Sequence, residues 1–316
     1  MSGKGFFEIE EFGNLGISFV SCSSQQNDFE GAGLVPVDDG HVWLSSRLRE
    51  SLEQAGLAHF DQVMATDDGH CMRALRDREN WRLSLDMAHG TPQCIYLKKH
   101  HVRTLTSRLR ARLRLDPGET PAQVEARNVG RLMRDGIDTM RLVAYGQKLH
   151  EDGRLESFLL TEELAGYKQL DHFLAERFGR RELFLTKQRD EDDQALRTLI
   201  GQVADTARRF HEAGYNHRDL YCCHFFIREL LPGHFDICLI DLQRVQHRRR
   251  NRRRWIVKDL AQLAYSAPRD RIKCTQKMAF IRRYLGVKKL RSCDKRLIRE
   301  VLAKQQLMEQ KQGIIP

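Results

Sequence analysis

One short segment constrains the fold and chemistry of this chain more than any other. His217-Arg218-Asp219 follows a predicted amphipathic helix, and 22 residues after Asp219 the apolar run Ile237–Ile240 leads into Asp241. Two carboxylates, one in a loop and one at the end of a strand, suit phosphoryl transfer. One of them can orient a hydroxyl nucleophile while the other holds the metal ion on ATP. We therefore predict Asp219 as the catalytic residue and Asp241 as a metal ligand.

A lysine and a glutamate upstream fit the same chemistry. Lys98 ends an apolar, strand-like run, and Glu125 lies on the apolar stripe of a helix predicted to start after Thr120 and to stop at Gly136. A carboxylate that faces a core is unfavourable unless it is paired, so we predict that Lys98 pairs with Glu125 and positions the phosphates of ATP. Lys99 is the alternative, but side chains alternate across a strand, so only one of the two lysines can face a cleft.

Two further positions carry weaker signals. His224 lies five residues after Asp219, where protein kinases place a metal-binding Asn. Imidazole suits Mg²⁺ less well than an oxygen ligand does, so His224 either binds the metal, hydrogen-bonds a phosphate or supports the loop. Gly69, in the turn-like sequence Asp67-Asp68-Gly69, is the one candidate for a glycine-rich phosphate loop, and an ordinary turn is the alternative.

A dense run of arginines follows Asp241. The segment from Arg244 to Arg254 contains seven arginines. Such charge runs are most often solvated surface, but the guanidinium group is also a planar fork for phosphate or carboxylate. We therefore predict that Arg244, Arg248 and Arg254 contact an anionic acceptor. Nucleic acid is not an expected partner, because no aromatic residue that could stack on bases is interleaved before Trp255.

The overall pattern predicts an α+β protein of two lobes. Residues 41–161 contain strand-like runs, the first of them around Phe60–Met64, and predict an N-lobe with an antiparallel sheet and one amphipathic helix. Residues 162–316 predict a mainly helical C-lobe that carries Asp219. Residues 1–40 are rich in Gly, Ser, Gln and acidic residues without a sustained period, and we predict a flexible N-terminal extension there.

Composition narrows the class of protein and its compartment. No run approaches about 18 consecutive apolar residues, so no transmembrane helix is expected, and the N-terminus lacks the apolar core of a secretory signal. Eight cysteines are scattered without a Cys-x-x-Cys pair, so reduced thiols in a cytoplasmic protein are expected. The formal net charge of +10 indicates an anionic partner: a phosphorylated substrate, an anionic lipid surface or a nucleic acid.

The combined motifs resemble one family, the lipopolysaccharide core heptose kinases and related Kdo kinases, which have a bilobal protein-kinase-like fold. The residues that carry the resemblance are Tyr96-Leu97-Lys98, the helix of Glu125, Thr161-Glu162-Glu163-Leu164, Asn216-His217-Arg218-Asp219, Cys223-His224-Phe225, Ile240-Asp241-Leu242 and Trp255 with Lys258-Asp259-Leu260. The resemblance implies ATP-dependent phosphorylation of a heptose or Kdo hydroxyl of the lipopolysaccharide inner core.

The resemblance also implies roles, cofactors and partners. The roles are catalysis for Asp219, metal binding for Asp241 and His224, ATP binding for Lys98, Glu125 and Glu162, and support of the catalytic loop for His217 and Asp259. The implied cofactors are ATP and Mg²⁺ or Mn²⁺. The implied partners are an anionic glycolipid or sugar acceptor, the inner-membrane surface and acyl carrier protein. The implied location is cytoplasmic, peripheral on the cytoplasmic face of the inner membrane.

Two alternatives stay open at this point. A protein kinase would carry the same carboxylates and transfer phosphate to Ser, Thr or Tyr of a protein. A non-catalytic module with a kinase-like fold would keep a basic, anion-binding surface, and the scarcity of glycine near the predicted phosphate loop agrees with it. The combination of Lys98, Glu125, Asp219 and Asp241 favours an enzyme.

Overall fold

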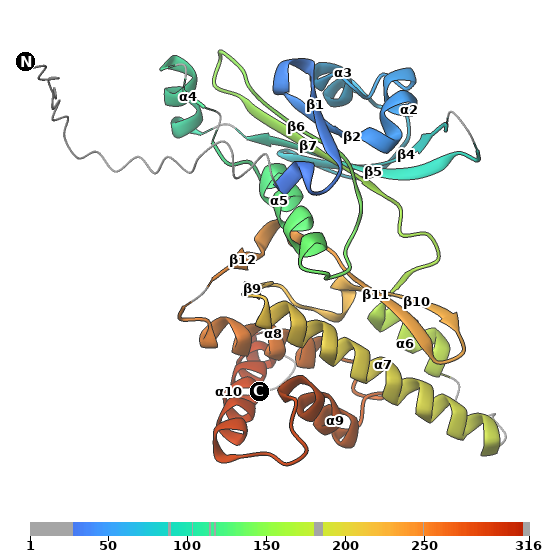
Figure 1. Cartoon of the computed structure of the whole chain (residues 1–316). Coiled ribbons are helices and arrows are strands. Elements are labelled where there is room, and N and C mark those ends of the chain that lie inside the picture. Colours follow the sequence, from blue (N-terminus) through green and yellow to red (C-terminus); the bar gives the residue numbers. More distant parts are fainter. Residues whose placement is uncertain are drawn as a thin grey trace, which may run out of the picture.

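The computed structural model describes residues 28–87, 90–102, 104–113, 115–116, 118–179, 186–248 and 250–311. Figure 1 shows two lobes, an upper one built on a large twisted sheet and a lower one built mainly from helices. The chain completes the sheet lobe before it enters the helical lobe. The predicted α+β architecture, with an antiparallel-sheet N-lobe and a mainly helical C-lobe, is confirmed.

The N-lobe is built on one antiparallel sheet, with the described strands in the order β1-β2-β6-β7-β5-β4-β3. In chain order the strands are β1 (Leu34–Val37), β2 (Val42–Ser45), β3 (His70–Leu75), β4 (Arg78–Leu85), β5 (Gln93–Val102), β6 (Leu142–Leu149) and β7 (Leu155–Glu162). The helices that accompany them are α2 (Arg49–Gln54), α3 (Phe60–Ala65), α4 (Leu105–Arg112) and α5 (Pro121–Arg134). Lys98 lies in the middle of β5, paired with Asn80 of β4 and Leu159 of β7.

Both faces of the sheet are covered, as the residues of β7 show. Phe158 and Leu160 are fully buried in an apolar cluster that includes residues of α2 and α3. Leu159, between them, is fully buried in a different cluster that includes residues of α5. Successive side chains of a strand point to opposite faces, so a strand covered on both sides needs consecutive apolar residues.

The first apolar run of the N-lobe forms a helix, so the predicted strand there is wrong. Phe60, Val63 and Met64 lie in α3, and Phe60 and Val63 are buried. Their i, i+3, i+4 spacing is that of a helix. Asp38 fixes the start of this helix, because its carboxylate accepts the backbone N–H of Phe60 at 2.8 Å. This capping group comes from outside the segment, and no local N-cap signal marks the helix in the sequence.

Residues 28–40 belong to the N-lobe, which corrects the predicted extension over residues 1–40. Strand β1 pairs with β2 at the edge of the sheet, and the ring of buried Phe29 lies 5.2 Å from that of Tyr145 on β6. The prediction failed because only a few separate contacts, a strand pairing and a buried ring, hold this segment. Such isolated contacts leave no periodic apolar pattern in the sequence. Residues 1–27 lie outside the described residues.

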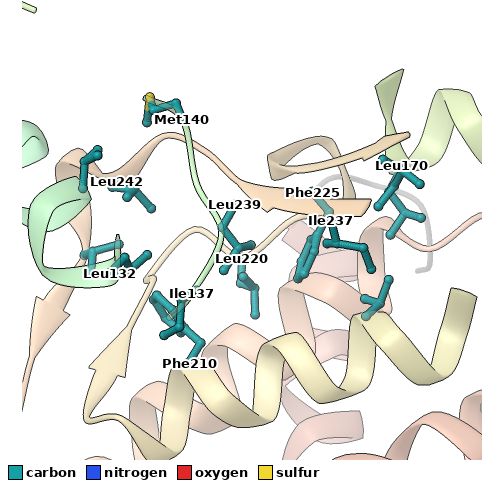
Figure 2. Packing of buried hydrophobic residues seen from close by; sticks show 14 of the residues in the cluster. Leu132, Ile137, Met140, Leu170, Phe210, Leu220, Phe225, Ile237, Leu239 and Leu242 are labelled. Atoms are coloured by element: carbon teal, nitrogen blue, oxygen red, sulfur yellow. The ribbon is translucent and has the colours of Figure 1, made fainter. Parts of the chain in front are cut away.

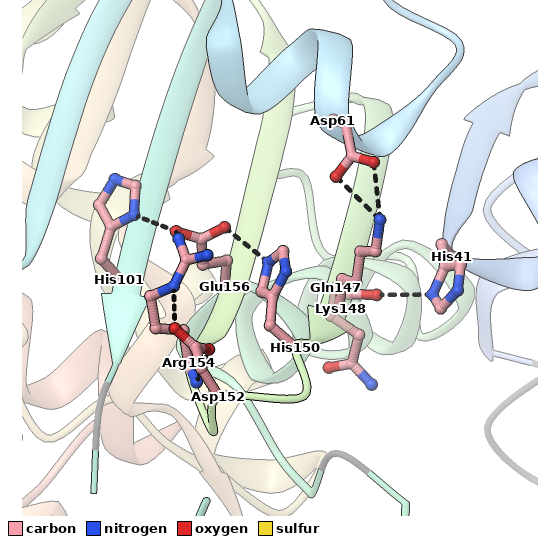
Figure 3. A network of polar contacts seen from close by, with 9 residues as sticks. All are labelled: His41, Asp61, His101, Gln147, Lys148, His150, Asp152, Arg154 and Glu156. Atoms are coloured by element: carbon pink, nitrogen blue, oxygen red, sulfur yellow. Dashed lines mark hydrogen bonds and ion pairs between the residues drawn. The ribbon is translucent and has the colours of Figure 1, made fainter. Parts of the chain in front are cut away.

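A polar network holds the outer end of the β6–β7 hairpin (Figure 3). Glu156 of β7 hydrogen-bonds His101 of β5 at 3.0 Å and His150 at 2.8 Å. Burial acts to raise the pKa of Glu156, but the hydrogen bonds and charges of the two histidines lower it overall. Lys148 of β6 donates to Asp61 of α3 at 2.7 Å, which ties the helix to the sheet.

The C-lobe contains α6 (Leu170–Phe178), α7 (Thr186–Glu212), α8 (Arg253–Ser266), α9 (Cys274–Leu285) and α10 (Ser292–Lys311). Its short strands are β8 (Lys168–Gln169), β9 (Tyr215–Asn216), β10 (Phe225–Leu231), β11 (His234–Leu239) and β12 (Gln246–His247). Figure 2 shows the core between the lobes, where Ile137 packs with Phe210 of α7, Leu220 and Leu239. None of the helices that the structure describes has the length and apolarity that crossing a membrane requires.

We expect that Gly130→Ala will destabilise the protein by about 1–3 kcal/mol. Gly130 lies in α5, where a Cβ would come within 2.3 Å of the backbone oxygen of Asp28. Ion pairs with Arg131 and Arg134 hold Asp28 in place. Gly201→Ala in α7 is the control, because a Cβ there meets no atom within 4 Å and alanine should stabilise the helix by up to about 1 kcal/mol. Urea unfolding measures the free energy of unfolding of both variants. If Gly130→Ala stabilised the protein as much as Gly201→Ala, the packing of Asp28 on α5 would be contradicted.

Candidate active site

A cleft of about 500 Å³ lies between the two lobes, within the range of about 300–1,000 Å³ that is typical of small-molecule sites. Its N-lobe wall comes from β3, β4 and β5, its C-lobe wall from β10 and the end of β11, and the connection after β7 closes it. Residues that line it include Tyr96, Lys98, Met140, Glu162, Phe226 and Asp241. The cleft therefore joins predicted site residues from both lobes.

Lys98 and Glu125 form the predicted ion pair. Thr120 caps α5 by accepting the N–H of Gln123 at 3.1 Å, and Pro121 takes the first helical position. This start of the helix directs Glu125 towards the sheet, where Lys98 Nζ donates to Glu125 Oε1 at 2.7 Å. Glu125 is fully buried, and its Oε2 has no hydrogen-bond partner within the part of the chain that the structure describes. The contact is confirmed, while its action on ATP stays a prediction.

Lys99 faces the other side of the sheet, as the alternation of β5 requires. Its ammonium group donates to the backbone oxygens of Met64 at 2.9 Å and Thr66 at 2.5 Å. Burial lowers the pKa of Lys99, and the attraction of Glu79 offsets only part of this effect. The choice of Lys98 over Lys99 as the lysine of the cleft is confirmed.

His100, two residues after Lys98, gives the stability of the N-lobe a dependence on pH. Burial, with smaller effects of Lys98 and Arg78, lowers the pKa of His100 to about 4 from an ordinary value of 6.5. The unfolded chain binds the proton first as the pH falls, so this contribution to stability is complete above pH 6.5 and is lost towards pH 4. We expect the free energy of unfolding to fall by about 2 kcal/mol between about pH 7 and pH 5 for this histidine alone.

The variant His100→Gln checks this expectation. Glutamine keeps a polar side chain that does not titrate, so between about pH 7 and pH 5 the variant should lose about 2 kcal/mol less than the wild type in urea unfolding. His217, whose pKa burial also lowers to about 4, should cause a further loss in both proteins. An equal loss in the two proteins would show that His100 is not held neutral in the folded state.

The carboxylate of Asp219 lies among three polar or cationic side chains. Arg244 Nη1 lies 2.6 Å from Asp219 Oδ2, and the Arg244 side chain is half exposed. Gln262 Nε2 donates to Oδ1 at 3.4 Å, and Lys258 Nζ lies 3.8 Å from the same oxygen. Burial lowers the pKa of Lys258, and the charge of Asp219 acts in the opposite direction. Gln262 is buried and Lys258 is partly buried, so a substrate hydroxyl would reach Asp219 from the side of Arg244.

Asp259 and His217 hold the loop that bears Asp219 in place, which agrees with the supporting contacts predicted for them. The fully buried Asp259 accepts the backbone N–H of His217 at 2.8 Å and that of Arg218 at 2.7 Å. Arg218 has a left-handed backbone (φ +71°), which is uncommon for a residue other than glycine and needs such support. His217 Nε2 donates to the backbone oxygen of Ile240 at 3.1 Å, which links this loop to the residue before Asp241.

Asp241 and His224 provide a candidate metal site. Asp241 follows β11 with a left-handed backbone (φ +59°) and lines the cleft. Gln243 Nε2 donates to Asp241 Oδ1 at 2.8 Å, while His224 Nε2 lies 3.5 Å from Oδ2. His224 Nδ1 donates to the backbone oxygen of Asp219, which leaves Nε2 to face Asp241.

The donor set around Asp241 fits a nucleotide-bound metal better than a metal held by protein alone. No group of three or more His, Cys, Asp or Glu side chains that could hold a metal occurs among the described residues. Mg²⁺ in kinase and ATPase sites is usually bound through one or two carboxylates, with phosphate oxygens and water completing the shell. The carboxylate of Asp241, with the imidazole of His224 beside it, matches that pattern.

The prediction of Gly69 as part of a phosphate loop is wrong, whereas Glu162 lies in the cleft. The β3–β4 hairpin turns at residues 76–77, and Gly69 precedes β3 at the opposite end of the hairpin. A Cβ at Gly69 would lie 2.6 Å from Leu83 Cδ2, and φ is +149°, so close packing on β4 explains the glycine. Glu162 lines the cleft and forms an ion pair with Arg47.

The arginine run divides into residues with different partners. Arg244 pairs with Asp219, so it lies at the candidate active site as predicted. Arg252 is half-buried and donates to backbone oxygens at the end of α7 and in β9. Arg253 forms an ion pair with Glu300 of α10 at 2.8 Å. The interpretation of the run as uniformly solvated surface is therefore wrong for Arg252, whereas Arg244 and Arg253 stay about half exposed in their ion pairs.

Arg248 and Arg254 contact Trp255 instead of the carboxylates of the cleft. Their guanidinium carbons lie 5.6 Å and 4.5 Å from the centre of the indole ring, and that of Arg218 lies at 4.9 Å. Arg218, which contacts Trp255, and Lys258, which contacts Asp219, were not among the predicted site residues. A signal for Lys258 was present, because it precedes Asp259 on a helix predicted to brace the loop.

Comparisons with known proteins agree with this geometry. A family model described as "Lipopolysaccharide kinase (Kdo/WaaP) family" matches residues 66–284. The chain is 35% identical over 166 residues to the lipopolysaccharide core heptose(I) kinase WaaP of Pseudomonas aeruginosa, a match that covers 52% of this chain and 59% of that protein. It is 30% identical over 236 residues to the corresponding kinase of Escherichia coli K12, which covers 73% of this chain and 84% of that protein.

A solved structure has a similar fold. It is that of WaaP in complex with acyl carrier protein, with a TM-score of 0.60 and 27% sequence identity. The match covers 83% of this chain and 95% of that chain. A match of this extent includes residues of both lobes.

Proposed function

The chain belongs to the lipopolysaccharide kinase (Kdo/WaaP) family, and we propose that it transfers the γ-phosphoryl group of ATP to a sugar hydroxyl of the lipopolysaccharide inner core. Its similarity to two core heptose(I) kinases supports a heptose as the acceptor, with a Kdo sugar as the alternative. The observation that carries the proposal is the pair of linked loops that bear Asp219 and Asp241, with His224 contacting both residues.

We propose a role in the reaction for each side chain of the site. Asp219 would orient the sugar hydroxyl and take up its proton as the hydroxyl oxygen bonds to the γ-phosphorus. The bond from the γ-phosphorus to the bridging oxygen breaks, and ADP leaves with those electrons. Lys98, held by Glu125, would bind the α- and β-phosphates, and Asp241 with His224 would hold Mg²⁺ or Mn²⁺. Such a bound cation neutralises charge on the phosphates.

Arg244 would help the acceptor reach the catalytic carboxylate. Its guanidinium group covers Asp219, yet the side chain is 52% exposed. An ion pair of this exposure is weak, with a typical value of about 0–1 kcal/mol. A phosphate or carboxylate on the acceptor could therefore draw Arg244 away and expose Asp219 to the hydroxyl.

We also propose acyl carrier protein as a partner, because the solved WaaP structure is a complex with that protein. In this chain an apolar cavity of about 360 Å³ lies among helices α6 to α10, lined by residues such as Leu174, Ile200, Leu263, Phe280 and Val301. Its elongated apolar ligand would be an acyl chain, because an apolar lining favours burial of hydrocarbon. Each methylene group buried there would contribute about 0.8 kcal/mol to binding. The net charge of +10 would in addition favour a peripheral position on the anionic cytoplasmic face of the inner membrane.

The test is a transfer assay with the purified chain, ATP, Mg²⁺ and inner-core lipid from which phosphate has been removed. Mass spectrometry should locate one added phosphate on a heptose or Kdo. Phosphate on Ser, Thr or Tyr of an added protein instead would indicate a protein kinase. A ligand stabilises a protein by RT ln(1 + [L]/Kd), so absence of both transfer and thermal stabilisation by ATP with Mg²⁺ would indicate a non-catalytic binding module.

A further inference from the structure

We infer that Arg218, Arg248 and Arg254, arranged around Trp255, form an anion subsite beside the catalytic loop. In this inference, which rests on the proposed function, the subsite binds a phosphate or carboxylate on the sugar next to the one that is phosphorylated. It would make the enzyme select acceptors by a charged group that takes no part in the reaction.

Three positive charges meet on one indole ring. The guanidinium carbons of Arg218, Arg248 and Arg254 lie 4.9, 5.6 and 4.5 Å from the centre of the Trp255 ring. These distances lie within the range of about 6 Å for cation–π attraction. Like charges gathered in this way repel one another, and an anion between them would remove the repulsion.

The three arginines have no acidic partner among the described residues. Arg244 and Arg253 of the same run pair with Asp219 and Glu300, but Arg218, Arg248 and Arg254 form no ion pair with any of the residues that the structure describes. The side chain of Arg248 donates to the neutral side chain of Gln246 at 2.9 Å. The fold therefore neutralises other arginines of this run and leaves these three available to an external anion.

Two buried donors in the cluster also lack an acceptor. Arg218 Nε and Trp255 Nε1 are both buried and have no hydrogen-bond partner among the described residues. Buried donors without an acceptor are rare in folded proteins, and each one calls for an explanation such as a ligand. The oxygens of a phosphate or carboxylate are the acceptors that such donors take, and Arg binds them in a planar, two-pronged geometry.

The start of α8 adds to the positive potential of the cluster. The helix begins at Arg253, its N-cap residue Arg252 makes no side-chain cap, and the first turn contains no acidic residue. Free N–H groups and the helix dipole favour an anion at such an end. Arg254 and Trp255 belong to this first turn, so the helix end and the arginine cluster act on the same place.

The cluster lies about one helical turn from the catalytic carboxylate. Lys258 follows Arg254 by four residues on α8, a rise of roughly 6 Å, and its Nζ is 3.8 Å from Asp219 Oδ1. Arg218 directly precedes Asp219 in the loop. One acceptor molecule could thus place a hydroxyl at Asp219 and a charged group of the neighbouring sugar at Trp255, which favours the acceptor over a membrane phospholipid or a protein partner.

The test compares Arg254→Gln with Arg250→Gln, which removes the same charge from an exposed residue of the same run outside the cluster. With detergent-solubilised anionic inner-core lipid, Arg254→Gln should raise KM for the acceptor about tenfold, while KM for ATP and kcat stay within about twofold. With an acceptor that lacks the neighbouring charged group, Arg254→Gln and wild type should have equal KM. Arg248→Gln should act in the same direction as Arg254→Gln.

The outcomes separate this inference from the proposed function. Absence of sugar phosphorylation by the wild type would overturn the proposed function itself. Wild-type turnover with equal acceptor KM in Arg254→Gln and Arg250→Gln would overturn the subsite alone. The subsite would also be overturned if Arg254→Gln were defective only in binding phosphatidylglycerol vesicles or acyl carrier protein. The cluster would then bind the membrane or the protein partner instead of the acceptor.

Discussion

Replacing Asp219 by Asn should lower kcat with a sugar acceptor by roughly 10²–10⁴-fold while leaving the fold intact. Asparagine has nearly the same size, and its amide oxygen can still accept the hydrogen bond from Gln262 that the native carboxylate accepts at 3.4 Å. It cannot take up the proton of a hydroxyl, and it loses the charge that faces Arg244 and Lys258. Steady-state turnover with ATP and the inner-core acceptor measures the loss.

A matched control separates catalysis from stability. Asp205 pairs with Arg283 at 2.6 Å, the same distance as Arg244 to Asp219, and the two aspartates are similarly exposed, at 24% and 20%. Loss of such a pair changes stability by about 0–1 kcal/mol, so Asp205→Asn and Asp219→Asn should unfold at similar temperatures. Only Asp219→Asn should lose turnover. Turnover close to that of the Asp205→Asn variant would remove Asp219 from the catalytic role.

The parts of the site that the sequence predicts are those with a local physical signal. Glu125 stands out because a carboxylate on an apolar helical stripe needs a cation, and the apolar run before that helix leads into Lys98. The predicted cap at Thr120 fixes the rotation of α5, and the structure shows the resulting contact at 2.7 Å. Asp241 stands out because a carboxylate directly after an apolar strand lies at an edge of the core.

The parts that the sequence does not predict depend on contacts between distant segments. Asp38 caps the helix that begins at Phe60, and Asp28 docks on α5, more than 100 residues later in the chain. The role of Gly69 depends on Leu83 of the neighbouring strand rather than on its own turn-like sequence. In each case the role of the residue depends on a contact with a distant segment. The sequence of one short segment cannot predict such a contact.

The arginine run shows that the sequence alone also does not predict which residue each functional side chain contacts. Its composition predicts an anionic partner, but the partner of each arginine depends on where α8 and the catalytic loop place it. Arg252 holds the loop after β12, Arg244 covers Asp219, and Arg254 contacts Trp255. Residues of one chemical type thus have different partners within eleven positions of the chain: backbone oxygens, a carboxylate and an indole ring.

Replacing Asp241 by Asn should lower kcat/KM by about 10³-fold and raise the Mg²⁺ concentration needed for half-maximal turnover. A neutral amide oxygen attracts a divalent cation less than a carboxylate does. The fold should tolerate the change, because Asn, like Asp, adopts the left-handed backbone that this position requires (φ +59°). The amide oxygen can also keep the hydrogen bond from Gln243. The variant therefore isolates the charge at the metal site.

Asp39→Asn is the control for this substitution. Asp39 also has a left-handed backbone (φ +54°), and it is an exposed residue of the N-lobe outside the cleft. Titration of turnover with Mg²⁺ should give wild-type behaviour for Asp39→Asn and a shifted, lower curve for Asp241→Asn. If both variants followed the wild-type curve, the metal would be held elsewhere, and the link from His217 through Ile240 to Asp241 would serve only to support the catalytic loop.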